Sequence, residues 1–134
     1  MNRRAALRAA LAAIAIVACD DGSKPVDPVW GKQPCAACSM LVSERRHAAQ
    51  LTTARGERHY FDDVGCLAHS LRHARPEARG MWARDESGWV DAKQARYAKG
   101  LKTPMDYGFA ASASGTASFD EVLAALAAPQ DRHD

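Results

Sequence analysis

Cys35, Cys38 and Met40 place three sulfur donors within six consecutive residues. Thiolate and thioether groups are soft ligands, and together they favour Cu(I) over harder ions. A zinc site or a disulfide gives the thioether of Met40 no role, whereas a copper site uses it. A second candidate thioether is Met105, which lies in the loop-like sequence Thr-Pro-Met-Asp-Tyr-Gly at 103–108. The pattern therefore predicts a split Cu(I) site.

The same cysteines allow other interpretations. Cys35-x-x-Cys38 with Cys66-x-x-His69 would supply a Cys₃His ligand set for structural zinc, although 27 residues separate the two pairs. A Cys35–Cys38 disulfide would close a small loop of little stabilising value and leave Cys66 as a thiol. A thiol–disulfide redox pair belongs at a helix N-terminus, whereas a proline-rich segment precedes Cys35. Taken singly, four histidines are further possible ligands: His47, His59, His69 and His73.

Residues 1–18 have the features of a lipoprotein signal peptide. Three arginines in the first eight residues precede an apolar segment at 11–18 that is too short to span a bilayer. The following sequence Ile-Val-Ala-Cys resembles a bacterial lipobox, in which the cysteine becomes acylated. We therefore expect Cys19 to be the lipidation site and to hold the protein at a membrane surface.

After the leader, the chain is expected to contain three segments. Residues 19–34 are rich in proline, glycine and aspartate and are predicted to form a tether, with Trp30 packed on the domain edge. Residues 35–75 and 76–134 each show strand patterns and then an amphipathic helix. We predict an α+β fold of two small, related strand-strand-helix halves with short antiparallel sheets.

The predicted helices have recognisable start signals. Asp62 or Asp63 is placed to cap the first helix, and Ser118 with Glu121 forms a capping-box pattern before the second. The expected elements are strands at 48–53, 59–61, 81–83, 88–90, 95–98 and 107–111, and helices at 64–73 and 119–126.

Two function classes are disfavoured. Basic and acidic residues are interleaved, and part of the formal charge of +2 belongs to the leader, so no nucleic-acid-binding surface is predicted. The adjacent carboxylates Asp62 and Asp63 lack a nearby nucleophile constellation, and helix capping or a docking role explains them better. We expect no enzymatic activity.

Four segments, in this order, resemble the NosL family, the lipoprotein copper chaperones of nitrous oxide reductase assembly. These segments are the lipobox ending at Cys19, the sulfur cluster at 35–40, the sequence Tyr-Phe-Asp-Asp-Val-Gly-Cys-Leu at 60–67, and the loop at 103–108. They extend over nearly all of the chain that follows the leader.

The resemblance implies a Cu(I)-binding protein that is lipid-anchored on the periplasmic side of the cell membrane. It also implies partners: nitrous oxide reductase and the membrane-bound maturation complex NosDFY. The implied ligands are a cysteine of the Cys35/Cys38 pair together with Met40 and Met105, and Cys38 is favoured because it is nearer Met40. Asp106 departs from the small residue expected after the loop methionine.

Overall fold

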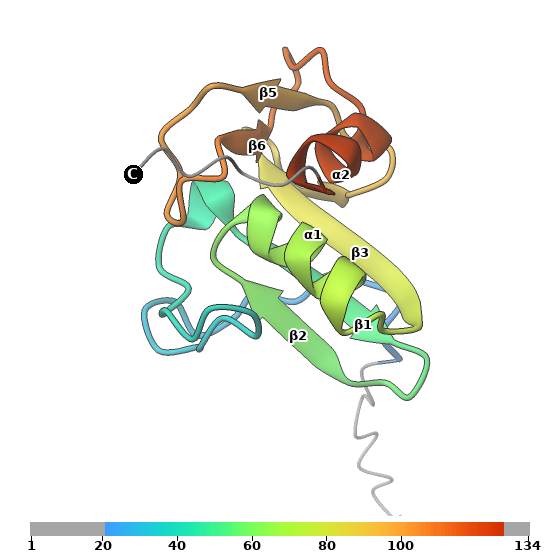
Figure 1. The fold of residues 1–134 in the computed structure, drawn as a ribbon. Helices are drawn as coiled ribbons and strands as arrows, with labels where there is room; N and C mark the ends of the chain where they lie inside the picture. The colour runs from blue at the N-terminus through green and yellow to red at the C-terminus, as the bar shows by residue number, and fades with distance from the viewer. Residues whose placement is uncertain (1–20, 128–134) are drawn as a thin grey trace, which may run out of the picture.

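The computed structural model describes residues 21–127. The predicted signal peptide, Cys19 and residues 128–134 lie outside the described residues. The described chain is an α+β fold of two helices, a four-stranded antiparallel sheet and a two-stranded sheet, which confirms the expected fold class (Figure 1). Within this range, neither helix has the length and apolar character needed to cross a bilayer.

The elements lie close to the segments that the sequence pattern predicts. A short 3-10 helix, η1, precedes the first strand. The bounds are η1 Arg45–His47, β1 Ala49–Thr53, β2 Arg58–Phe61, α1 Val64–His73, β3 Ala78–Asp85, β4 Gly88–Asp91, β5 Tyr97–Lys99, β6 Phe109–Ala111 and α2 Phe119–Ala127.

The larger sheet joins strands from both predicted halves. Its order is β2-β1-β3-β4, and the register pairs Ala49 of β1 with Phe61 of β2 on one side and Ala83 of β3 on the other. A two-stranded hairpin is marginal in water, so pairing β1 with β3 supplies the width that neither half has alone. The two predicted halves thus share one sheet across residue 76.

Strand β1 is central and buried along its whole length. Successive side chains of a strand face opposite sides, so Leu51 points to the core while Gln50 and Thr52 point the other way. Those two polar side chains contact the N-terminal segment: Val26 N donates to Gln50 Oε1 at 3.1 Å, and Thr52 Oγ1 donates to Gly22 O at 2.8 Å. The described part of the expected tether therefore lies along the sheet.

Trp30 packs at the edge of the domain, as predicted. Its ring stacks with Trp89 of β4 at a centroid distance of 6.4 Å, and the Arg84 guanidinium lies over both rings. Asp27 completes the contact, because its Oδ1 accepts from Trp89 Nε1 at 2.7 Å and lies 3.5 Å from Arg84 Nη1. We name these four residues the tryptophan clamp; it fixes the N-terminal segment to β3 and β4.

Both helices begin at the predicted caps. Asp63 has extended backbone angles, and its side chain accepts from Gly65 N at 2.9 Å, so Asp63 rather than Asp62 is the N-cap of α1. Ser118 and Glu121 exchange reciprocal hydrogen bonds of 3.1 Å, the predicted capping box of α2. In Figure 1, α1 lies across one face of the larger sheet.

Candidate metal centre

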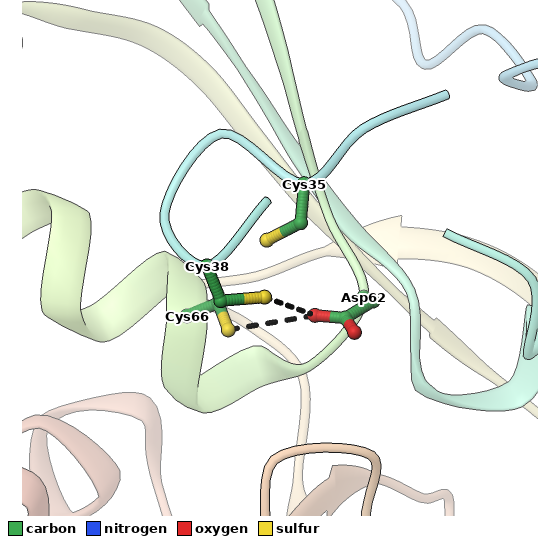
Figure 2. A group of neighbouring side chains, drawn as sticks. All are labelled: Cys35, Cys38, Asp62 and Cys66. Atoms are coloured by element: carbon green, nitrogen blue, oxygen red, sulfur yellow. Dashed lines mark hydrogen bonds between the residues drawn. The ribbon is translucent and has the colours of Figure 1, made fainter. Parts of the chain in front are cut away.

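Four side chains converge where β2 meets α1. One ligand atom from each of Cys35, Cys38, Asp62 and Cys66 lies within 4.8 Å of the others. We name these residues the Cys₃Asp cluster. Figure 2 shows that two of its cysteines come from the loop that precedes η1, the carboxylate from the end of β2, and the third cysteine from α1.

The loop at 35–40 is folded tightly by its own backbone. Cys35 N donates to Met40 O at 2.7 Å, and Ser39 N donates to Cys35 O at 3.1 Å, with Ser39 in the left-handed region at φ 64°. Ala36 N donates to Tyr60 O at 2.8 Å, which ties the loop to β2. These bonds hold both loop thiols at the end of β2.

Asp62 organises the thiols from the opposite side. Its Oδ1 accepts hydrogen bonds from Cys38 Sγ at 3.3 Å and Cys66 Sγ at 3.5 Å (Figure 2). The carboxylate is only 4% exposed, and Cys35 and Cys66 are almost fully buried, whereas Cys38 is half-buried. Cys38 is therefore the sulfur of the cluster with the most access to solvent.

The thiols have unequal acidity. The single thiol proton of Cys66 can be donated to Cys35 in place of Asp62, and that hydrogen bond lowers the pKa of the Cys35 thiol to about 6, despite its burial. Backbone N–H groups of Ala37, Asp62 and Cys38 also lower it. The same hydrogen bond raises the pKa of Cys66, and burial raises that of Cys38 to about 11. Cys35 is thus the most acidic of the three thiols, and a cation bound by all three would displace protons.

The cluster can hold a metal ion. Three cysteines and one carboxylate are sufficient for a four-coordinate site, and the soft sulfur donors suit Cu(I) and Zn(II). If all the groups ionised, several negative charges would lie within 4.8 Å of one another. A cation would relieve that repulsion. The geometry therefore defines a possible metal site without fixing which metal it takes.

The structure brings together two of the four predicted metal ligands, Cys35 and Cys38. Met40 and Met105 are exposed side chains, at 58% and 37%. The backbone of Met40 closes the 35–40 loop, and Met105 N donates to Asp63 Oδ2 at 3.0 Å, which holds its loop at the start of α1. Both thioethers thus come from segments that adjoin the cluster.

Sequence reasoning placed Cys66 in a Cys₃His zinc set and gave Asp62 no ligand role. In the structure Cys66 joins the other two cysteines, but the fourth member of the cluster is Asp62, and His69 is exposed. The spacing offered a signal: Asp62 directly precedes the helix cap, and Cys66 lies four residues later in the first turn of α1. A strand–helix corner brings such a pair together.

The fold and the cluster define a small α+β protein with a thiol-rich candidate metal site at a strand–helix corner. No family model and no curated protein matches the sequence. The fold is similar to that of the copper chaperone NosL from Shewanella denitrificans in its crystal structure. The TM-score is 0.58 over 73% of this chain and 83% of that chain, at 16% sequence identity. This likeness supports the fold expected from the NosL resemblance.

Proposed function

We propose that this protein is a Cu(I) metallochaperone that delivers copper for the maturation of nitrous oxide reductase. It would act with the NosDFY complex while acylated Cys19 anchors it on the periplasmic side of the cell membrane. The observation that carries the proposal is the Cys₃Asp cluster, a set of three sulfur atoms and a carboxylate within 4.8 Å in a NosL-like fold.

The donor set suits a transferred ion. Cu(I) is stable with two or three sulfur ligands, so the cluster provides enough thiolates without an oxygen donor. Asp62 then acts as the hydrogen-bond acceptor that orients Cys38 and Cys66. Met40 and Met105 offer uncharged sulfur at the exposed side of the site, where a weaker ligand can be replaced.

The burial of the ligands suggests the order of exchange. Cys35 and Cys66 are 3% and 1% exposed, so a partner cannot approach them directly. Cys38 is half-buried and lies two residues from exposed Met40. An incoming ligand would replace Cys38 first, and the buried thiolates would release the ion last.

Structural zinc is the second candidate, because Cys₃Asp also supplies the four ligands of a closed tetrahedral zinc site. Zinc would need the Asp62 oxygen as a ligand, whereas Cu(I) would not. The two functions therefore differ in how they depend on Asp62 and on the methionines.

Titration of the reduced protein with Cu(I), in competition with a chromophoric chelator, tests the proposal. We expect tight binding that is lost in Cys38→Ser and weakened in Met40→Leu. Met81→Leu is the matched control, because Met81 is 7% exposed and belongs to the core. Unchanged Cu(I) affinity in the Cys38 and Met40 variants, with zinc binding abolished by Asp62→Asn, would favour structural zinc.

Delivery and anchoring need measurements in cells. Cells that make Cys38→Ser should produce nitrous oxide reductase with less copper than cells that make Met81→Leu. Cys19→Ser should move the protein from the membrane fraction to the soluble fraction. Full copper loading of the reductase in cells that make Cys38→Ser would rule out delivery through this cluster.

A further inference from the structure

A pair of histidines on α1 lies outside the Cys₃Asp cluster. His69 and His73 occupy positions i and i+4 in the last part of the helix, and both are exposed. Side chains at this spacing lie on the same face of a helix. Their ring centroids are 4.2 Å apart, with an interplanar angle of 36°. The two imidazoles are thus already side by side.

We propose that His69 and His73 form a second metal site, which binds a divalent ion of the Cu²⁺ or Zn²⁺ type. Imidazole nitrogen suits these ions, and for a given set of nitrogen donors Cu²⁺ binds most tightly. Two histidines at i and i+4 on one helix face are a known arrangement for holding such an ion. Two imidazoles leave other coordination positions open to water or to a ligand from a partner.

The surroundings leave the site accessible and favour positive charge. His69 and His73 line a cavity of about 580 Å³ between α1 and α2, to which Tyr107 and Leu126 also contribute. His73 is the last residue of α1, where the carbonyl end of the helix dipole favours a cation. The cationic residue Arg72 also lines the cavity, and its guanidinium donates to the carbonyl oxygens of Leu126 and Ala127 in α2.

The two sites on α1 differ in chemical softness. Cys66 lies on the buried side of the helix and His69 on the exposed side, yet three residues advance a helix by only about 5 Å along its axis. One helix thus carries one thiol of the cluster that suits Cu(I) and two imidazoles that suit a divalent ion. The histidine site does not depend on the proposed copper delivery, because none of its ligands belongs to the Cys₃Asp cluster.

Cu²⁺ titration followed by electron paramagnetic resonance tests the site. The parent is the full chain in which Cys19, Cys35, Cys38 and Cys66 are replaced by serine, because thiols would reduce Cu²⁺. Circular dichroism checks its folding; if it does not fold, native protein with methylthiolated cysteines takes its place. We expect one equivalent of Cu²⁺ with nitrogen couplings from two imidazoles.

The variants locate the ligands. His69→Ala and His73→Ala each leave a single imidazole, so the ion is no longer held by two ligands of one helix. The Cu²⁺ affinity should then fall about tenfold or more. The double change His73→Ala with Ala74→His keeps the number of histidines but turns the second imidazole by about 100°, which places it about 140° from His69 around the helix, and it should show the same loss. His59→Ala is the control and should bind as the parent does, because it removes a half-buried histidine of β2 whose Nε2 lies 3.4 Å from Glu57 Oε2.

Three results would overturn the site: the absence of Cu²⁺ binding in the parent, coupling to fewer than two imidazoles, or undiminished affinity in the repositioned double variant. None of them affects Cu(I) binding by the native cysteines, which is measured separately. The failure of the histidine site and the failure of the proposed chaperone function therefore remain distinguishable.

Discussion

At Gly65, α1 is in close contact with Tyr107 of the loop at 103–108. A Cβ atom at position 65 would lie 2.0 Å from Cγ and 2.4 Å from Cβ of Tyr107. Real Cβ atoms do not approach other atoms so closely, and Tyr107 Cβ cannot move without its backbone. Gly65→Ala should therefore displace the loop that carries Met105 from the start of α1.

The expected magnitude is the difference between two effects. Forcing extra volume into a packed contact costs about 1–3 kcal/mol, while replacing glycine by alanine in a helix gains up to about 1 kcal/mol. Gly65→Ala alone should thus lower the free energy of unfolding by up to about 2 kcal/mol. When Tyr107→Gly has already removed both the ring and its Cβ, only the helix-propensity gain remains, and the same substitution should be neutral or stabilising.

Urea unfolding of the four proteins in this double-mutant cycle measures the coupling. We expect the effect of Gly65→Ala to change by about 1–3 kcal/mol, and to change direction, between the native and Tyr107→Gly backgrounds. Equal destabilisation in both backgrounds would refute the steric argument. It would mean that alanine at position 65 acts on α1 itself and not through Tyr107.

Three further changes test the supporting contacts. Hydrogen bonds from the Ser112 hydroxyl and the Ala113 N–H lower the pKa of Glu86 from 4.5 to about 2. At pH values between about 2 and 4.5, Glu86 therefore holds a proton in the unfolded chain but not in the folded chain. The free energy of unfolding should rise with pH across that window. In thermal unfolding at pH 2–4.5, Glu86→Gln should flatten the rise, whereas the exposed control Glu77→Gln should not. Trp30→Ala opens the tryptophan clamp and should lower the free energy of unfolding in urea by about 1–3 kcal/mol, since the ring is only partly buried. A decrease smaller than the experimental error would show that the clamp does not stabilise the fold. Ser118→Ala removes the cap of α2 and should cost about 1 kcal/mol, with Ser114→Ala as a surface comparison that should cost less.

The local elements could be predicted from the sequence because their signals are local. The pattern gave α1 the bounds 64–73 that the structure shows, and the Ser118–Glu121 capping box was visible as a spacing. The shared sheet could not be predicted in the same way. Pairing of β1 with β3 depends on which exposed strand edges meet, and alternation within each strand does not specify that partner.

The metal centre was only partly predictable for a similar reason. Cys35 and Cys38 are close in sequence, so their spacing alone indicated a site. Cys66 reaches them only because α1 packs against the sheet, and Asp62 reaches them because the chain bends between β2 and the cap at Asp63. Only one of the adjacent residues Asp62 and Asp63 can cap α1. The sequence does not show which of them caps the helix and which contacts the thiols.

If Cys19 is acylated as proposed, the position of the N-terminal segment on the sheet limits how far the domain can stand from the membrane. The first described residue is already held, since Arg79 Nη1 donates to Asp21 O at 2.7 Å. Under the proposed acylation of Cys19, the two-residue step from Cys19 to Asp21 spans at most about 7 Å. The domain would then rest against the lipid headgroups and meet its partners by two-dimensional diffusion, in a restricted range of orientations. A partner would have to present its copper-receiving site close to the bilayer surface.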